Sequence, residues 1–199
     1  GRLPEAENVY QQVLKKYPDQ HVALHMLGLI AHKVGKNEIA LQLITKAVTI
    51  KSDYIDAQNN LGIVQQSLGN DSEAISSFKK AVSINPNHFH AYNNLGLLYY
   101  KQGNVDEAVD SYDRALAAHS GHTDSYINRG VALQSLGKLE EAAEAHKQEL
   151  IQLHESNQTS ISQLQNEIDL PIKVTLDKMA EKGRWILAEF AKILGNRPK

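Results

Sequence analysis

The chain repeats itself every 34 residues, and this period constrains its fold more than any other feature of the sequence. The stretch NNLGIVQQSLGN at 59–70 returns as NNLGLLYYKQGN at 93–104. Three sets of small residues recur at the same step: Gly28, Gly62, Gly96 and Gly130; Ala6, Ala40, Ala74, Ala108 and Ala142; and Gly1, Gly35, Gly69, Gly103 and Gly137. Because glycine makes up about 7% of average sequences, the first set has chance odds of about 1 in 40,000. The chain is therefore built from repeated units.

The spacing within each unit is helical. Leu24, Leu27 and Ala31 recur at helical intervals, and a second run of this kind begins at Ala40. The third set of glycines, which includes Gly35, lies where the first helix must stop, because glycine accepts the left-handed conformation that follows a helix end. The other two sets place small residues on interior faces, where helix axes approach closely. The pattern predicts an all-α chain of helical hairpins.

These motifs resemble the tetratricopeptide repeat (TPR), whose signature is W-x2-L-G-x2-Y, then A-x3-F, then P. The third unit carries Tyr92, Leu95, Gly96, Tyr99, Ala108 and Tyr112 at the signature positions, and the second carries Leu61, Gly62, Ala74, Phe78 and Pro86. The resemblance implies a right-handed α-solenoid of antiparallel helix pairs, the TPR superhelix. The fourth unit departs at Arg129, His146 and Glu149. From these departures we expect its outer side to pack against something other than another standard repeat.

The register predicts where each unit begins and ends. We expect residues 1–20 to form the second helix of a truncated unit. Four further units follow at 21–54, 55–88, 89–122 and 123–156, the last of them divergent. Residues 157–199 are expected to form a helical cap or extension. The chain is expected to begin halfway through a unit, as a fragment of a longer array. We interpret the tail as a non-TPR helical cap over the open end of the solenoid. A dimerisation helix and a junction to a further domain are the alternatives.

If the first helices line the inside of the superhelix, as the resemblance implies, their non-packing side forms a groove. The sixth position of successive units is Met26, Asn60, Asn94 and Asn128, and the fifth is His25, Asn59, Asn93 and Ile127. The predicted peptide-binding residues are the polar members His25, Asn59, Asn60, Asn93, Asn94 and Asn128, with Gln66, Tyr100 and Gln134 from the twelfth position and Lys33 and Lys101 from the thirteenth.

The asparagines suit recognition of a peptide backbone, because each side chain offers one acceptor and two donors. Packed helices lie roughly 8–10 Å apart, and an extended chain advances about 3.3 Å per residue, so a bound strand would meet an asparagine at about every third residue. The series is similar to the asparagine ladder of O-linked N-acetylglucosamine transferases, which implies that Asn60, Asn94 and Asn128 hold substrate polypeptide. Met26 departs from it. Hydrogen bonding between neighbouring helices is the alternative role.

A clamp for a C-terminal carboxylate, as in co-chaperone repeats, does not fit this sequence. Of the residues at the five positions that such a clamp requires, only Asn60 has the required type; the others are His25, Leu29, His90 and Asn94.

No motif for catalysis or cofactor binding occurs. The sequence has no P-loop, dinucleotide fingerprint or nucleophile elbow. His21 and His25 lie one helical turn apart, but the spacing supplies no third metal ligand. We interpret the histidines at the unit junctions as loop residues: His88, His90, His119 and His122. The prediction is a chain with no catalytic residues, no metal and no cofactor.

The composition of the chain argues against some classes of binding partner. The net charge of −2 gives no field that would gather nucleic acid or an anionic membrane, and the absence of cysteine excludes disulfides. No apolar run approaches the roughly 18 residues of a membrane span. Together with the resemblance to the tetratricopeptide repeat, which implies a concave groove, these features lead us to expect a cytoplasmic, non-catalytic scaffold that binds an extended polypeptide in that groove. The alternatives are the substrate-recognition or oligomerisation arm of a larger enzyme, such as a glycosyltransferase, and self-assembly into a homo-oligomer through the C-terminal helices.

Overall fold

The computed structural model describes residues 3–160, 162 and 181. The chain divides into two compact units, Gly1–Glu149 and Leu150–Lys199. Every regular element in the described residues is a helix, and no strand occurs among them. The prediction of an all-α fold is confirmed.

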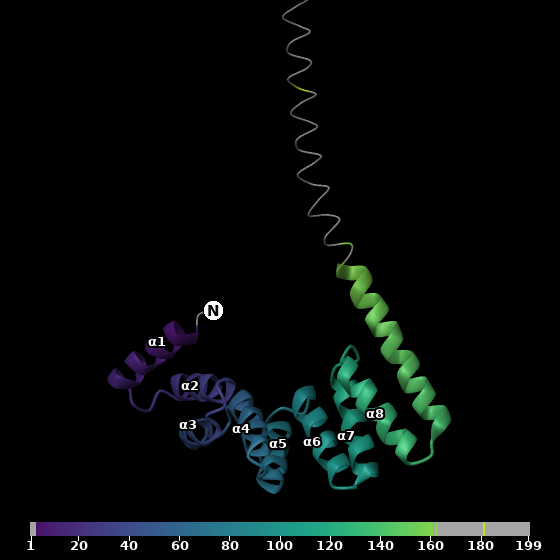
Figure 1. Cartoon of the computed structure of the whole chain (residues 1–199), viewed down its shortest axis with the longest axis horizontal. Coiled ribbons are helices and arrows are strands. Elements are labelled where there is room, and N and C mark those ends of the chain that lie inside the picture. Colours follow the sequence, from purple (N-terminus) through teal and green to yellow (C-terminus); the bar gives the residue numbers. More distant parts are fainter. Residues whose placement is uncertain (1–2, 161, 163–180, 182–199) are drawn as a thin grey trace, which may run out of the picture. The chain divides into compact units, whose positions relative to one another are not determined.

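The helices of the first unit follow the period of the sequence (Figure 1). They are α1 (Leu3–Lys16), α2 (His21–Lys33), α3 (Asn37–Ile50), α4 (Ile55–Ser67), α5 (Asp71–Ile84), α6 (Phe89–Lys101), α7 (Val105–Ala118) and α8 (Thr123–Ser135). Residues 139–149 are helical as well. The first helices α2, α4 and α6 pack against the second helices α3, α5 and α7 of the same hairpins. The first helices start 34 residues apart, as the period requires.

The turn between the two helices of a hairpin depends on a glycine. Gly35 has a φ of 79° and Gly137 a φ of 75°, which are left-handed values that a side chain would strain. The amide of Gly35 donates to the carbonyl of His32, and the amide of Lys36 donates to that of Ala31, each at 2.9 Å. These bonds satisfy the last carbonyls of α2, as the glycine pattern predicts.

The glycine in the middle of α4, α6 and α8 lies under a ring from the helix that follows, whereas Gly28 of α2 lies under the aliphatic side chain of Ile44. A methyl group added at Gly62 would lie 2.6 Å from the Phe78 ring, closer than packed carbons can approach. The equivalent contact joins Gly96 to Tyr112. Glycine is therefore required here because the two helices of a hairpin pack ring against backbone.

The divergent fourth unit uses the same contact with a different ring. His146 lies over Gly130, where an added methyl group would be 2.7 Å from the imidazole. Arg129 forms an ion pair with Asp113 of α7. Two of the three departures from the signature therefore have partners within the first unit: His146 takes the place of the aromatic ring, and Arg129, at an apolar position of the signature, pairs with Asp113.

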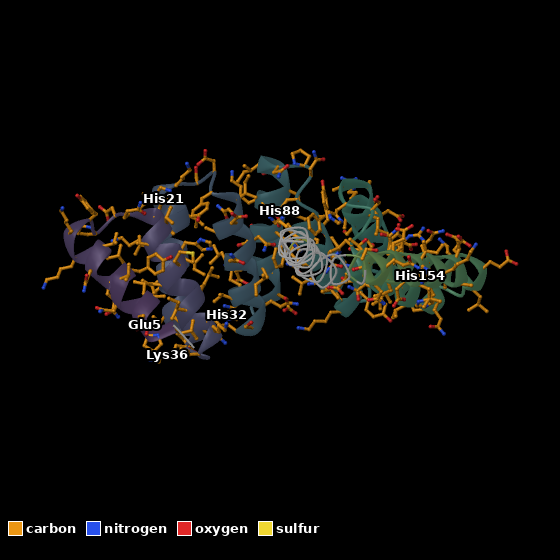
Figure 2. The ribbon with its side chains drawn as sticks, turned by 90° about the horizontal axis from the view of Figure 1, so that it is seen from above. Glu5, His21, His32, Lys36, His88 and His154 are labelled. Atoms are coloured by element: carbon orange, nitrogen blue, oxygen red, sulfur yellow. The ribbon has the colours of Figure 1, made fainter. Side chains whose placement is uncertain are left out.

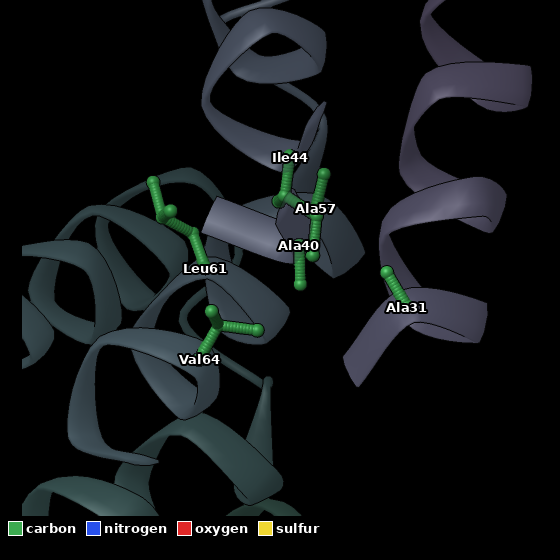
Figure 3. Close-up of a cluster of buried hydrophobic side chains, with 6 residues drawn as sticks. All are labelled: Ala31, Ala40, Ile44, Ala57, Leu61 and Val64. Carbon is green, nitrogen blue, oxygen red and sulfur yellow. The ribbon is translucent and has the colours of Figure 1, made fainter. Parts of the chain in front are cut away.

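The core consists of successive clusters, each of which joins one hairpin to the next. Figure 3 shows the first of these, formed by Ala31, Ala40, Ile44, Ala57, Leu61 and Val64. The second contains Ala74, Phe78, Ala81, Ala91, Leu95 and Leu98. Half of the residues in each cluster are alanines, whose short side chains let the helices approach closely.

In the second unit, residues 150–160 are helical and mostly exposed. The predicted cap at 157–199 lies almost entirely outside the described residues. Within the part of the chain that the structure describes, no helix combines the length and the apolarity needed to cross a bilayer.

Candidate functional site

The candidate site is one side of the first helices. The second, sixth, ninth and thirteenth positions of a unit are three or four residues apart, so they lie along one face of a helix. We call this surface the first-helix face. Its members are Val22, Met26, Leu29 and Lys33 on α2; Asp56, Asn60, Ile63 and Ser67 on α4; His90, Asn94, Leu97 and Lys101 on α6; and Asp124, Asn128, Val131 and Ser135 on α8.

Side-chain hydrogen bonds link each first helix to the next, and we call each of these bonds a rung. All three follow one pattern, from a sixth-position amide to the fifth-position residue of the preceding unit: Asn60 Nδ2 to His25 Nε2 at 2.9 Å, Asn94 Nδ2 to Asn59 Oδ1 at 3.2 Å, and Asn128 Nδ2 to Asn93 Oδ1 at 3.1 Å. Hydrogen bonding between neighbouring helices, the alternative role for the asparagines, is therefore present in the structure.

The two residues of a rung differ in exposure. The fifth-position side is buried, with 3% of His25 and 8% each of Asn59 and Asn93 exposed. The sequence predicts all three as groove residues, but the structure buries them, and each accepts a rung bond from the next unit. The sixth-position residues are partly exposed: Asn60, Asn94 and Asn128. They are the rung residues that a ligand can reach.

A rung uses only part of its asparagine. The amide nitrogen carries two N–H donors, and the amide oxygen is a further acceptor. Among the hydrogen bonds between described residues, Asn94 uses one donor in its rung, and its oxygen accepts none. A sixth-position asparagine can therefore hold its neighbour and still offer a donor and an acceptor to a ligand.

Buried polar groups fix both ends of the ladder. His25 Nε2 accepts from the rung amide, so the proton lies on Nδ1, which donates to the Tyr54 hydroxyl at 3.0 Å. At the other end, Asn93 Oδ1 also accepts from the Ser125 hydroxyl, at 3.1 Å. The fifth position of α8 is Ile127, which has no acceptor for a further rung. The ladder therefore has three rungs.

The remaining predicted groove residues lie near the C-terminal ends of the first helices. Lys101 Nζ lies 2.6 Å from Asp71 Oδ2, so the Lys101 ammonium group forms an ion pair that joins α6 to α5. The others differ in exposure: Lys33 and Gln134 are exposed, and Gln66 and Tyr100 are partly buried. The structure pairs the asparagines in rungs, but none of these residues takes part in a rung.

A cluster of aromatic rings forms where the α7–α8 turn meets the start of α6. The Phe89 ring centroid lies 3.9 Å from that of His90, 4.6 Å from that of His119 and 4.9 Å from that of His122. His90 lies within α6 rather than in a loop, which corrects the prediction for this residue. Sequence reasoning missed the cluster because Phe89 and His90 are almost one unit away from His119 and His122 in the chain. The two pairs meet only because α7 runs back antiparallel to α6.

The histidines are not arranged as a metal centre. Among the residues that the structure describes, no group of three or more His, Asp or Glu could hold a metal ion. His21 and His25 both contact the Tyr54 ring, with centroids 5.4 and 4.9 Å away. His32 lies at the opposite end of α2 from His21 (Figure 2), where it bonds to Asn37 at 2.8 Å.

We expect the free energy of unfolding to decrease as the pH falls from about 7 to about 5. Burial lowers the pKa of His25, His90 and His122, and neighbouring histidines lower it further at the last two, while Asp56 and Asp124 partly oppose these shifts. Unfolded histidine titrates near pH 6.5, so below that pH the unfolded chain binds protons that the folded chain excludes. The stabilisation is complete above about pH 7 and is lost as the pH falls through the lowered pKa values. Urea denaturation at the two pH values measures the change.

The substitutions His90→Gln and His122→Gln should reduce this pH dependence. His154→Gln is the matched control, because His154 is an exposed histidine of the second unit. A free energy of unfolding that increases on acidification would contradict the conclusion that burial lowers the pKa values of these histidines.

Comparisons with known proteins agree with this architecture. The family model described as the tetratricopeptide repeat matches residues 1–55 and 93–157, and a second, described as a TPR repeat, matches residues 66–103. A comparison with curated protein sequences finds no match.

Solved structures share the fold. The crystal structure of MamA is 25% identical, with a TM-score of 0.73 over 79% of this chain and 92% of that chain. YrrB, described as a TPR protein with an unusual peptide-binding site, is 22% identical, with a TM-score of 0.62 over 78% of this chain and 84% of that one. BtubC from P. vanneervenii is 19% identical, with a TM-score of 0.70 over 79% of this chain and 75% of that one. The predicted TPR solenoid is confirmed.

Proposed function

Because this chain belongs to the tetratricopeptide repeat family, we propose that it is a non-catalytic interaction scaffold whose first-helix face binds an extended polypeptide. The polypeptide lies across α2, α4, α6 and α8, and its backbone pairs with the sixth-position asparagines. The role agrees with the fold, since YrrB, which shares it, is described as having a peptide-binding site.

The observation that carries the proposal is that the two residues of a rung have different roles: one is buried and holds the other, which is partly exposed to a ligand. The buried fifth-position residue accepts one N–H from the asparagine of the next unit, and this bond fixes the asparagine side chain before any ligand arrives. A side chain that is already ordered loses little conformational freedom on binding, so more of its hydrogen-bond energy contributes to affinity.

The asparagines read backbone rather than side chains. One amide can accept from a ligand N–H and donate to a ligand C=O, and every non-proline residue carries both groups. Such pairing tolerates many ligand sequences. Specificity must therefore come from the residues that flank the asparagines on the first-helix face.

Methylation of the ligand backbone tests the proposal. A display library of random peptides is selected for binding to the wild-type chain, and one captured sequence, the selected peptide, is synthesised. Three versions carry N-methyl groups at every third residue, one version for each register. We expect one register to lose about 10-fold or more in affinity, measured by isothermal titration calorimetry, because ~1.4 kcal/mol corresponds to a factor of 10.

The two other registers are the matched controls, since they carry the same number of methyl groups on N–H groups that face away from the asparagines. Equal affinity for all three versions and the parent peptide would rule out backbone pairing. Failure of the library to yield any peptide would rule out the binding role itself.

A further inference from the structure

An apolar row runs beside the asparagines on the first-helix face. The ninth position of each unit lies three residues after the sixth, and so almost one helical turn further along the same face. Its members are Leu29, Ile63, Leu97 and Val131. Leu97 is 37% exposed and Val131 41%, and Leu29 and Ile63 are half-buried. Every unit therefore presents an apolar side chain next to its sixth-position residue.

The rungs fix the spacing of this row. Direct hydrogen bonds between sixth- and fifth-position side chains show that α2, α4, α6 and α8 pack in sequence against one another. Helices in such contact lie roughly 8–10 Å apart. The apolar side chains of successive units are spaced by about the same distance.

Only one extended conformation matches that spacing. In a β-strand, side chains on one face recur every second residue, after about 6.6 Å, which falls out of register with the units. In the polyproline II conformation the chain has three residues per turn and rises about 3.1 Å per residue, so a side chain recurs after about 9.3 Å. Its N–H and C=O groups make no internal hydrogen bonds, and are free to pair with the asparagines.

We infer that the ligand is a polypeptide segment in the polyproline II conformation, with apolar side chains at every third residue packed against Leu29, Ile63, Leu97 and Val131. This inference rests on the proposed function and adds the class of ligand. Four units span about 12 residues at ~3.1 Å per residue. The segment carries its backbone-pairing groups and its apolar side chains in the same three-residue register.

The first unit differs from the others in a way that orients the segment. On α2 the second, sixth and ninth positions are all apolar: Val22, which is 39% exposed, Met26 and Leu29. The end of the ligand that crosses α2 therefore meets Met26 where the other units offer an asparagine, so apolar contacts replace the asparagine pair at that end. We expect the largest apolar residue of the segment at that end.

Two designed peptides test the inference with the full chain. Both are capped, have about 12 residues and share one composition of leucine, proline, serine and glutamine. The periodic peptide carries leucine at every third residue along its whole length. The alternating peptide carries the same number of leucines at every second residue, so they occupy a shorter stretch of the peptide. We expect the periodic peptide to bind about 10-fold more tightly, measured by fluorescence anisotropy. The double variant Leu97→Ser/Val131→Ser should abolish the preference.

The matched control is Val9→Ser/Leu139→Ser, which removes two exposed apolar side chains, 56% and 65% exposed, outside the first-helix face. It should keep the preference. Equal binding of the two peptides, with no effect of Leu97→Ser/Val131→Ser, overturns the inference but leaves the proposed function intact if a display-selected peptide still binds. If neither designed peptide nor any library peptide binds, both the inference and the proposed function fail.

Discussion

Replacing Phe78 by alanine lowers the free energy of unfolding by about 3–5 kcal/mol, the range for truncating a buried aromatic residue. Phe78 is fully buried, and its ring covers the backbone of α4 at Gly62. Gly62 has no side chain that could fill the space left by the ring, so we expect a cavity to remain above it. Guanidinium denaturation followed by circular dichroism measures the loss.

The control for this variant is Tyr17→Ala, because Tyr17 is 54% exposed and its removal should change the unfolding free energy by less than about 0.5 kcal/mol. A double-mutant cycle sharpens the test. Gly62→Ala is destabilising in the wild type, where its methyl group would meet the ring. In Phe78→Ala the ring is gone, and the same substitution becomes stabilising by up to ~1 kcal/mol through helix propensity. If Gly62→Ala changed the free energy of unfolding in the same direction in the wild type and in Phe78→Ala, the contact between the ring and the glycine would be contradicted.

Breaking the middle rung from either side lowers the free energy of unfolding by about 1–3 kcal/mol. Asn94→Ala leaves the buried Oδ1 of Asn59 without its donor. Asn59→Ala removes the acceptor and leaves a small space at a buried position. Both variants lose the same hydrogen bond between α6 and α4, and urea denaturation compares them.

The double variant Asn59→Ala/Asn94→Ala should cost less than the sum of the two single variants, because the rung can be lost only once. Strictly additive costs would show that the two side chains act independently, which contradicts the rung.

The sequence predicts the framework because the framework depends on fixed spacing. A glycine every 34 residues locates each hairpin turn, as the positive φ of Gly35 shows. The glycine at the middle of a first helix and the ring in the second helix belong to one signature, so the contact of Gly62 with Phe78 follows from the resemblance. The substitution of His146 for such a ring does not follow, because imidazole is not part of the pattern.

The sequence leaves the role of the asparagines open for a physical reason. An amide on an exposed face can bond to solvent, to a ligand or to a neighbouring helix, and spacing alone does not decide among them. The rungs run between different positions of successive units, the sixth and the fifth, and the 34-residue comparison of equivalent positions does not reveal them. His25 shows the consequence: its position predicts a groove residue, but its contacts with Tyr54 and Asn60 bury it.

The affinity of the selected peptide for Asn94→Ala and Asn59→Ala, measured side by side at neutral pH, tests the central claim most directly. Both variants lose the same rung, but only Asn94 is partly exposed on the first-helix face. We predict a loss of about 10-fold or more for Asn94→Ala, which removes the ligand hydrogen bonds, and a smaller loss of about 2- to 3-fold for Asn59→Ala, which removes only the rung that orders Asn94. Equal losses in the two variants would mean that the asparagines only join helices, and would contradict their proposed role in binding.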